Sequence, residues 1–353
     1  MKILILGDTH LGIRNDSEFF SDFFFKFFDN VVFPYIKEHN ITDVIQTGDL
    51  MDKRKGVNYR TLNKISTDFM GKLGKLGCTL HIIPGNHDIY YRNSNEVNSM
   101  TELFSWMSHV KIYNEPTSVP FEGCYIDFIP WLNKNNSEQS IDFIRKSTAQ
   151  VCVGHFEICG FEMYPGVAGH GGLVSDLFQD YDLTISGHYH HKSAQKNITY
   201  VGTPYEMTWA DYNDPKGFHI LDTEDRSLTF FENPYRMFIK AFYSSEIDYT
   251  DYDFSCLTGT IVKVIVQDKT DNGKYEWFLS KINDQNPVDM SVVDSDVTVL
   301  HGVDEEQLET LDTFVVLTQS AKATAENEGL DPKTMDELIQ NLYSEAITLG
   351  REN

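Results

Sequence analysis

Carboxylates, histidines and one asparagine recur at five places in the sequence, each directly after a short apolar run. The five segments are Asp8-Thr9-His10, Gly48-Asp49-Leu50-Met51-Asp52, Gly85-Asn86-His87-Asp88, Gly154-His155 and Gly187-His188-Tyr189-His190. Their carboxylate and amide oxygens and imidazole nitrogens, without thiolate sulfur, suit Mn²⁺, Fe²⁺ or Zn²⁺ better than Ca²⁺ or Cu⁺. The residue types therefore predict a divalent metal site.

The candidate ligands are too many for a single tetrahedral ion. They are Asp8, His10, Asp49, Asn86, His155, His188 and His190. Two ions about 3.5–4 Å apart that share a bridging carboxylate would use a set of this size. Such a pair would activate water and stabilise charge on phosphoryl oxygens, so the predicted chemistry is hydrolysis of a phosphate ester. Each motif alone is weak evidence, but a metal site explains all five in this order.

The apolar runs before the motifs predict the strands that must position them. These strands are expected at 2–7, 43–47, 79–83, 151–154 and 183–186, with helices near 18–39 and 59–76. Ligands of open α/β sheets bind beyond the carboxyl ends of the strands, so one ridge would gather the five loops. Later strands follow one another with little helix between them. We therefore expect an α/β fold of four layers, in which two sheets form a sandwich flanked by helices.

A change of pattern near 233–237 predicts a domain boundary. Residues 1–232 would form the metal-binding domain, and residues 239–325 a small α+β capping domain. Asp331 and Pro332 are typical of a helix start, which predicts a terminal helix over 331–350. One apolar stripe runs along it, formed by Met335, Leu338, Ile339, Leu342, Tyr343, Ala346 and Ile347.

Bulk composition narrows the class of protein. The chain has 353 residues, of which 41% are hydrophobic, and no apolar run approaches the length of a membrane helix. Five scattered cysteines without a C-x-x-C favour a reducing cytoplasm, and the apolar start is too short for a signal peptide. The net charge of -24 counts against a nucleic-acid ligand. Contact with DNA would need bound metal ions, a local basic stretch or a partner.

In order and content the five motifs resemble D-x-H, G-D-x-x-D, G-N-H-D, G-H and G-H-x-H of the calcineurin-like metallophosphoesterases. The resemblance covers about residues 1–230. Within this superfamily the chain is similar to the SbcD-type nucleases, including the recombination nuclease subunits of T4-like phages. The supporting segments are the start M-K-I-L-x-L-G-D-x-H-L-G and residues 123–131 and 200–204.

The resemblance implies how the ligands are shared. One metal would be held by Asp8, His10, Asp49 and His190, and the second by Asp49, Asn86, His155 and His188, with Asp49 bridging. Manganese is the implied metal, with Mg²⁺, Fe²⁺ and Zn²⁺ as alternatives. Asp52 stands where some nuclease relatives have a second catalytic histidine, so it is left outside the metal shell.

Catalytic and substrate-binding roles follow beside the ligands. His87 would face the substrate and donate a proton or hydrogen bond to the leaving oxygen, with Asp88 orienting its ring. Cations and rings just past the metal loops could hold a phosphate backbone and an unpaired base. The candidates are Lys53, Arg54, Tyr90, Tyr91, Arg92 and His170. A solvated charge run and ordinary loop packing are the alternatives.

Two apolar segments predict partners. Phenylalanines at 19, 20, 23, 24, 25, 27 and 28 exceed a single helical stripe, which suggests a homodimer interface. The resemblance implies that the terminal helix grips the coiled coil of an SbcC-like ATPase, although folding back on the small domain is the simpler account. The sequence contains no G-x-x-x-x-G-K-[ST], so any ATP-driven step belongs to a partner.

The function expected from motifs and resemblance together is a DNA nuclease, exonuclease or endonuclease, within an SbcCD-like complex of recombination, repair and replication. If a phage encodes the chain, it would act in the host cytoplasm. The alternatives are a phosphatase or phosphodiesterase acting on phosphoproteins or nucleotides, which the acidity favours, and a non-catalytic scaffold. Protein phosphatases of the superfamily tend to show G-D-x-V-D-R-G and G-N-H-E, whereas Leu50 and Asp88 stand here. A scaffold would lose ligands, and all are present.

Overall fold

The computed structural model describes residues 1–164, 167–168 and 172–294. The chain divides into two compact units, Met1–Ile239 and Lys240–Asn353. The predicted terminal helix over 331–350, and the part of the predicted capping domain beyond residue 294, lie outside the described residues.

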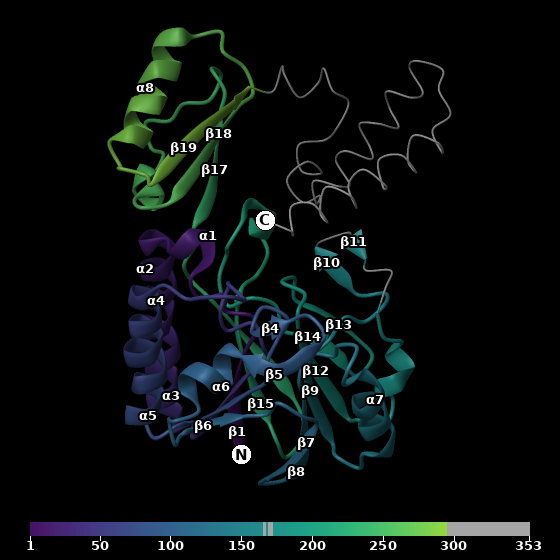
Figure 1. Ribbon diagram of the computed structural model, residues 1–353. Coiled ribbons are helices and arrows are strands. Elements are labelled where there is room, and N and C mark those ends of the chain that lie inside the picture. Colours follow the sequence, from purple (N-terminus) through teal and green to yellow (C-terminus); the bar gives the residue numbers. More distant parts are fainter. Residues whose placement is uncertain (165–166, 169–171, 295–353) are drawn as a thin grey trace, which may run out of the picture. The chain divides into compact units, whose positions relative to one another are not determined.

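Two six-stranded sheets form the centre of the first unit (Figure 1). The first sheet has the order β16-β15-β1-β2-β3-β6, and β1, β2, β3 and β6 run parallel. Its strands are β1 (Lys2–Leu6), β2 (Asp43–Gln46), β3 (Thr79–Ile82), β6 (Val110–Ile112), β15 (Gly217–Asp222) and β16 (Leu228–Glu232). The second has the order β13-β14-β12-β9-β8-β7, with a parallel centre and antiparallel edges. Its strands are β7 (Thr117–Phe121), β8 (Cys124–Ile129), β9 (Val151–His155), β12 (Leu183–Gly187), β13 (Ser193–Gln195) and β14 (Ile198–Tyr200).

Helices lie on the outer side of each sheet. Next to the first sheet are α2 (Glu18–Phe27), η1 (Phe28–Val32), α3 (Phe33–His39), α4 (Tyr59–Lys64), η2 (Ile65–Met70), α5 (Gly71–Lys75) and α6 (Ser99–Phe104), and next to the second is α7 (Ser137–Lys146). The two long predicted helices therefore form, each with a π-helical turn in its middle. Short elements are α1 (Ile13–Asp16), η3 (Ser175–Phe178), η4 (Trp209–Asp211) and the hairpins β4 (Ile89–Tyr91)–β5 (Ser94–Asn98) and β10 (Glu162–Tyr164)–β11 (Val167–Ala168).

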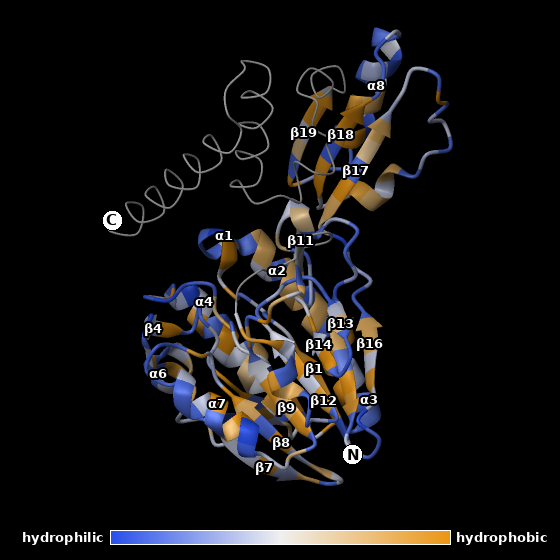
Figure 2. Cartoon of the chain, turned by 90° about the vertical axis from the view of Figure 1, so that its right-hand side faces the viewer, coloured by the Kyte–Doolittle hydropathy of each residue, from blue (hydrophilic) through white to orange (hydrophobic). Residues whose placement is uncertain are grey.

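Burial explains why the two sheets stay together. One apolar cluster joins their inner faces, with Ile5 and Ile45 from the first sheet and Val153 and Ile185 from the second, all without exposed surface. A second cluster lies between the outer face of the second sheet and α7. Figure 2 shows the hydrophobic colours concentrated on the strands. The predicted sandwich with helices on both sides is confirmed, and it holds the strand ends that carry the motifs at fixed positions.

The phenylalanines of the first long helix pack within the chain. Phe20, Phe23, Phe24, Phe25, Phe27 and Phe28 are all buried. The ring of Phe24 stacks on Tyr205 with centroids 3.5 Å apart, and Phe28 contacts Phe69 from the neighbouring helix. The inference of a dimer interface from surplus phenylalanines was therefore wrong in its premise, because the helix is covered on more than one side.

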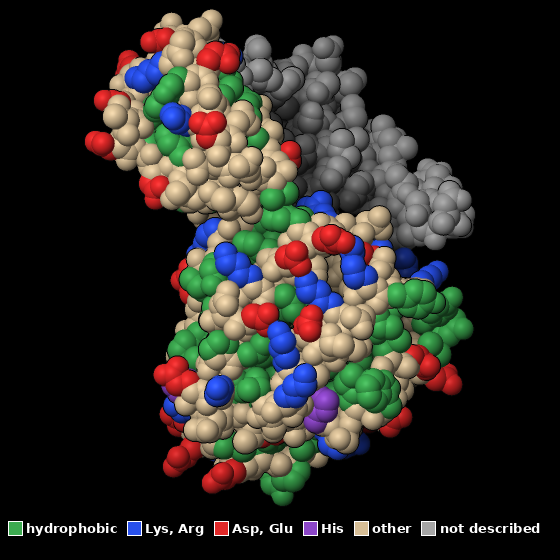
Figure 3. All heavy atoms as spheres, turned by 90° about the vertical axis from the view of Figure 1, so that its left-hand side faces the viewer, with side chains coloured by type: hydrophobic (Ala, Val, Ile, Leu, Met, Phe, Trp, Pro, Cys, Tyr) green, Lys and Arg blue, Asp and Glu red, His purple; other side chains and the backbone are tan. Residues whose placement is uncertain are grey.

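Charges of both signs alternate on the face over these helices (Figure 3). Lys64 pairs with Asp22 at 2.6 Å, and Lys72 with Asp29 at 2.6 Å, so ion pairs connect neighbouring helices. Exposed pairs of this kind contribute little stability, about 0–1 kcal/mol each. This face carries no single-sign basic field for a polyanion.

The second unit contains a three-stranded sheet in the order β17-β18-β19. Its described elements are β17 (Phe238–Tyr243), η5 (Phe254–Leu257), β18 (Ile261–Val266), α8 (Asn272–Asn283) and β19 (Asp289–Asp294). Asp271 caps α8 by accepting a hydrogen bond from the amide of Lys274, and Phe278 of α8 packs in an aromatic cluster with Tyr243 and Tyr249. The unit is α+β over its described part. Among the described residues no helix has the length and apolar character of a membrane span.

Candidate metal centre

The five predicted segments meet at the carboxyl ends of β1, β2, β3, β9 and β12. Backbone hydrogen bonds join the first two loops, because the amides of Thr9 and His10 donate to the carbonyl of Asp49 at 3.1 and 3.0 Å. The amide of His188 donates to Oδ2 of Asp8 at 2.8 Å, which ties the loop after β12 to the loop after β1. Segments up to 180 residues apart in sequence therefore share one small volume.

One group of side chains gathers Asp8, His10 and His190. A ligand atom from each lies within 4.8 Å of the other two, and Nε2 of His10 is 3.1 Å from Nε2 of His190. A divalent cation could bind two imidazole nitrogens that lie this close together, along with the carboxylate that faces them. These are three of the four residues that the resemblance implies for the first metal.

A second group centres on the side-chain oxygen of Asn86. Nε2 of His155 and Nδ1 of His188 each lie 3.0 Å from it. Asp49 lies between the groups, since its Oδ2 is 3.3 Å from Nε2 of His155 and 3.7 Å from Nε2 of His10. All seven predicted ligands are thus together, with Asp49 in the middle.

His87 lies beside the same carboxylate. Its backbone amide donates to Oδ1 of Asp49 at 2.7 Å, and its ring meets that of His10 edge-on with centroids 4.7 Å apart. A nitrogen of His87 also lies within 4.8 Å of ligand atoms of His10 and Asp49, so distance alone leaves room for His87 as a ligand. Metal content of a His87 variant separates the two roles.

The expectation that Asp88 orients the ring of His87 is wrong. Nδ1 of His87 donates to the backbone carbonyl of Asp52 at 2.6 Å. The buried carboxylate of Asp88 instead accepts from the amides of Gly85 and Met51 at 2.9 and 3.3 Å. Buried backbone amides outside a sheet need a hydrogen-bond acceptor. Asp88 supplies it to the loops that contain Gly85 and Met51, and so joins the two loops.

Several buried polar atoms of this region have no hydrogen-bond partner. They include Oδ1 of Asp8 and Nδ1 of His10, whose side chains are almost completely buried. Leaving such groups unsatisfied costs about 1–3 kcal/mol each. An oxygen and nitrogen donor set with unused lone pairs fits divalent cations, and this fit agrees with the donor chemistry of the sequence.

The backbone around the candidate ligands is strained. His10, Asp49 and His188 have φ angles of 41°, 53° and 89°, in the left-handed region that non-glycine residues avoid. Glycine is needed beside them: a Cβ at Gly85 would lie 2.2 Å from Oδ1 of Asp49, and one at Gly187 would lie 2.5 Å from Oδ1 of Asp8. Strain of about 1–3 kcal/mol per residue persists where the surrounding structure imposes it, commonly at functional sites.

Burial and neighbouring charges shift the pKa of most groups in this centre. Burial lowers the pKa of His188 to about 3 and that of His190 to about 4, so both rings are neutral, the form that binds metals. Burial raises the pKa of Asp8, whereas His155 and His10 overcome burial to lower the pKa of Asp49. For His155, burial is overcome by Asp49 and Asp8, which raise its pKa to about 9.

The ring of His155 is held by a backbone group that no motif predicts. Its Nδ1 donates to the carbonyl of Thr47 at 2.9 Å, which directs Nε2 toward Asn86 and Asp49. The indole of Trp131 forms a wall beside His155 and His188, with centroids 5.7 and 5.1 Å away. Sequence reasoning missed the orienting roles of Thr47 and Asp52 because backbone carbonyls carry no residue-type signal.

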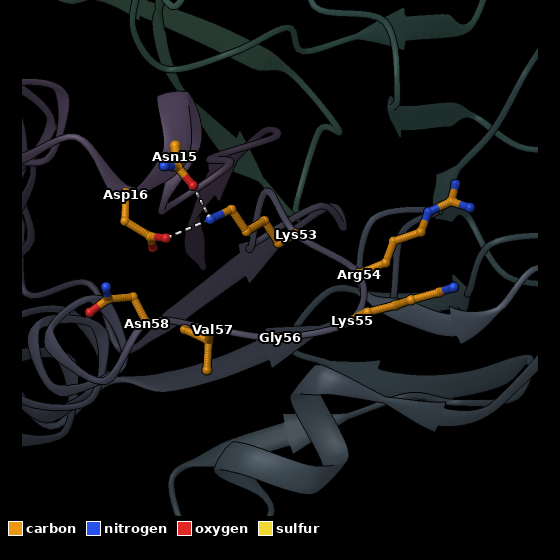
Figure 4. Close-up of a pocket in the computed structure, with 8 residues that line it drawn as sticks. All are labelled: Asn15, Asp16, Lys53, Arg54, Lys55, Gly56, Val57 and Asn58. Atoms are coloured by element: carbon orange, nitrogen blue, oxygen red, sulfur yellow. Dashed lines mark hydrogen bonds and ion pairs between the residues drawn. The ribbon is translucent and has the colours of Figure 1, made fainter. Parts of the chain in front are cut away.

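Three of the predicted substrate-binding residues, Lys53, Arg54 and Tyr90, line two neighbouring hollows. One, of about 760 Å³, is lined by 15–16 and 53–58, and the other, of about 160 Å³, by Met51, Lys53, Arg54, Gly56, Val57, Tyr90, Val97, Asn98, Ser99, Glu102 and Leu103. Lys53 is turned toward Asn15 and Asp16, pairing with Asp16 at 2.7 Å, while Arg54 and Lys55 extend away from them (Figure 4). The side chain of His170 lies outside the described residues.

The rings of Tyr90 and Tyr91 are exposed beside the smaller hollow. They meet edge-on at 4.9 Å, and Nζ of Lys55 lies 5.8 Å from the ring of Tyr90. Arg92, at the turn of the same hairpin, is exposed as well. The hairpin therefore presents rings and a cation to solvent, as the prediction of substrate contacts requires.

Comparison with known proteins supplies independent findings. Residues 1–192 match the calcineurin-like phosphoesterase family. Exonuclease subunit 1 of Enterobacteria phage T4 is 35% identical over 349 residues, which cover 98% of this chain and 99% of that protein. The solved structure of GAP50, the anchor in the inner membrane complex of Plasmodium, is similar at 13% identity with a TM-score of 0.34, over 67% of this chain and 90% of that one. A likeness as low as the last supports no argument.

Proposed function

The chain belongs to the calcineurin-like phosphoesterase family, and from this membership we propose that it is a metal-dependent nuclease that hydrolyses phosphodiester bonds of DNA. The observation that carries the proposal is the convergence of seven oxygen and nitrogen ligands around Asp49 at the ends of five strands. DNA as substrate is supported by the phage relative, which is an exonuclease subunit and aligns over nearly the whole chain.

We assign the ligands to two divalent cations, and manganese is the proposed metal. Asp8, His10 and His190 would hold one, Asn86, His155 and His188 the other, and Asp49 would contact both. Bound cations of this kind supply an activated water and neutralise phosphoryl charge. The chain's own contribution is to fix these donors in advance, through strained backbone and buried hydrogen bonds.

His87 is the proposed proton donor to the leaving oxygen. Because its Nδ1 donates to the Asp52 carbonyl, the proton would leave from Nε2 of a doubly protonated ring, and the neutral ring would keep its proton on Nδ1. A ring held by a backbone acceptor keeps one orientation, which a general acid needs to meet the substrate. Asp88 would act on catalysis only indirectly, by holding the loops of Asp49 and His87 together.

The two hollows beside the metal loops fit the two parts of a nucleotide. Cations of the 53–55 segment would contact phosphates, as would Arg92, while an unpaired base stacks on Tyr90 or Tyr91. Lys53 already pairs with Asp16, so it would attract a phosphate less strongly than the sequence alone suggests. This local arrangement offers a way for a chain of net charge -24 to approach a polyanion.

The alternative function is a phosphatase acting on phosphoproteins or nucleotides. It would use the same ligands, and the acidity of the chain favours it. Incubating purified protein and Mn²⁺ with end-labelled single-stranded and duplex DNA, beside a phosphopeptide, separates the two. We expect DNA cleavage and no phosphate release from the peptide. The reverse pattern would contradict the nuclease and favour the phosphatase.

An assembly is also proposed. The phage relative is named as a subunit, which supports a partner, and we propose a coiled-coil ATPase of the SbcC type bound through the terminal segment that contains Leu338, Leu342 and Tyr343. Removing 331–353 should then abolish co-purification with the ATPase and spare cleavage of simple substrates.

A homodimer is proposed from the family resemblance alone, and light scattering tests it. The proposed location is the cytoplasm, of the host if a phage encodes the chain, where roles in recombination, repair and replication would lie.

A further inference from the structure

Lys216 is a lysine buried in the interior of the first unit, just before β15. Only 1% of its side chain is exposed. A buried ammonium group is costly unless it is paired and its hydrogens are accepted. A buried lysine therefore has partners that offset the free-energy cost of burying its charge. The identity of these partners indicates its role.

All three ammonium hydrogens of Lys216 have an acceptor. Oδ1 of Asp211 lies at 2.7 Å, Oδ2 of Asp214 at 2.7 Å, and the backbone carbonyl of His190 at 2.8 Å. Three acceptors saturate a lysine, which has three donors and no other polar atom. Two of them balance its charge, but the third is the peptide of a candidate metal ligand.

Each carboxylate has a second partner besides the lysine. Oδ2 of Asp211 accepts from the amides of Met207 and Thr208, each at 2.9 Å. Oδ1 of Asp214 accepts from Nδ1 of His191 at 2.8 Å. Asp211 therefore ties the ammonium to the backbone of 207–208, Asp214 connects it to His191, and Lys216 itself holds the carbonyl of His190.

His190 needs such a hold because it lies between β12 and β13, outside any strand. Its carbonyl accepts from Lys216 and from the amide of Thr203 at 3.2 Å. At the other end of the residue, Nε2 of the ring faces Nε2 of His10 at 3.1 Å. A rotation of this peptide would carry the ring away from His10 and Asp8.

We propose that Lys216 is a positioning residue for His190, and so for the cation shared by Asp8, His10 and His190. The inference rests on the proposed function, since it presupposes that this group binds a cation. Lys216 is not itself a candidate ligand, and its hydrogen bond to this part of the site goes to the backbone carbonyl of His190. Groups that orient a metal ligand typically change metal affinity by about 10–100-fold when removed.

The test is Mn²⁺ binding to the full chain, measured by calorimetry and by the spin-resonance signal of a coupled Mn²⁺ pair. In Lys216→Met we expect one of two Mn²⁺ to bind at least about tenfold more weakly, and the coupled signal to give way to that of a single ion. Lys192→Met is the matched control, because it makes the same substitution in the loop that carries His190, at a side chain that lies over Phe230, 4.5 Å from its ring centre. It should bind both ions as the parent does.

Removing the lysine alone leaves two buried carboxylates, which can unfold the chain. The triple variant Lys216→Met, Asp211→Asn, Asp214→Asn removes the three charges together, and we expect it to fold and to show the same loss of one ion. Parent-like binding of both ions by either variant would overturn the proposal. Unfolding of the triple variant would also overturn it, by making Lys216 a requirement of the fold. Failure of the parent chain to bind Mn²⁺ would instead refute the proposed function, so the two failures are distinguishable.

Discussion

Strands β2 and β3 carry one aspartate–histidine combination within them and another just beyond their carboxyl ends, and the two combinations have different surroundings. Asp43 and His81 lie within the strands, whereas Asp49 and His87 follow them. Both regions are largely buried and use the same residue types. The difference lies in how completely their polar atoms are satisfied.

Within the strands every polar atom of the histidine has a protein partner. Nε2 of His81 donates to Oδ1 of Asp43 at 3.0 Å, and Nδ1 accepts from the hydroxyl of Tyr113 at 2.7 Å. Oδ2 of Asp43 accepts from Thr42 at 2.7 Å, and the ring of His81 stacks on Phe128. Such a group stabilises the fold, and neither nitrogen of its histidine is left to bind a ligand.

Beyond the strands, Asp49 and His87 have hydrogen-bond partners of their own, but the region around them also contains buried polar atoms without one. Oδ1 of Asp8 and Nδ1 of His10, which follow the adjacent strand β1, have no hydrogen-bond partner, and three candidate ligands have left-handed backbone. Buried polar atoms without partners destabilise a chain unless something binds them. The comparison teaches that satisfaction by the protein, rather than residue type or burial, separates a structural aspartate–histidine pair from a ligand site.

The largest effect is expected from Asp49→Ala compared with Asp43→Ala. Asp49 lies between both ligand groups, so its loss should empty both cation sites and abolish hydrolysis, a larger effect than the about 10²–10⁴-fold loss typical of an acid–base group. Asp43→Ala should keep both ions and the turnover. Metal analysis and DNA cleavage measure both variants. Full metal content in Asp49→Ala would break the comparison.

Next in size is His87→Ala compared with His81→Ala. As a proton donor outside the metal shell, His87 should be replaceable with metals retained and with a fall in turnover of about 10²–10⁴-fold. The His81 variant should cleave DNA like the parent, because its ring lies away from the ligands. Loss of ions from His87→Ala would make His87 a ligand, which its distance to His10 and Asp49 permits.

The free energy of unfolding should follow the opposite order, with a larger loss in His81→Ala than in His87→Ala. Removing His81 takes away the partner of Oδ1 of Asp43 and of the Tyr113 hydroxyl and opens a space beside Phe128, which should lower the free energy of unfolding by about 1–3 kcal/mol. Removing His87, which lies at the partly exposed site, should lower the free energy of unfolding by less. Urea unfolding of the metal-free chains measures both. Equal destabilisation by the two variants would contradict the distinction between a satisfied pair and a site.

The smallest effect concerns pH. Burial opposes ionisation of Asp43, but hydrogen bonds from His81 and Thr42 hold its pKa below the ordinary value. A carboxyl with a lowered folded pKa stabilises the fold above its unfolded pKa of about 3.9 and loses this contribution as the pH falls through the folded value. The stability difference between the parent and Asp43→Asn, below about 1 kcal/mol, should therefore shrink from pH 6 toward pH 3 (roughly the range of carboxyl titration). If this stability difference grew as the pH fell, the folded pKa of Asp43 would be raised rather than lowered.

These contrasts mark what the sequence could predict. The ligand loops were predictable because each motif follows an apolar run, and strand ends in parallel sheets meet at one edge. The family resemblance and the two-sheet fold are confirmed by the match over 1–192 and by the sheet order.

Features that depend on tertiary partners were not predictable. A buried lysine such as Lys216 reads in sequence as a surface residue, and the acceptor for the ring of His87 is a backbone carbonyl rather than Asp88. The phenylalanines of α2 and η1 looked like surplus because the loop that brings Tyr205 against Phe24 has no periodic pattern.

The central claim is that a pair of divalent cations binds around Asp49. Crystals of the chain grown with Mn²⁺ and measured at the manganese absorption edge test it most directly. The account predicts two anomalous peaks on either side of the Asp49 carboxylate, one among Asp8, His10 and His190 and the other among Asn86, His155 and His188. Absence of peaks at these side chains, or peaks only elsewhere in the molecule, would contradict it.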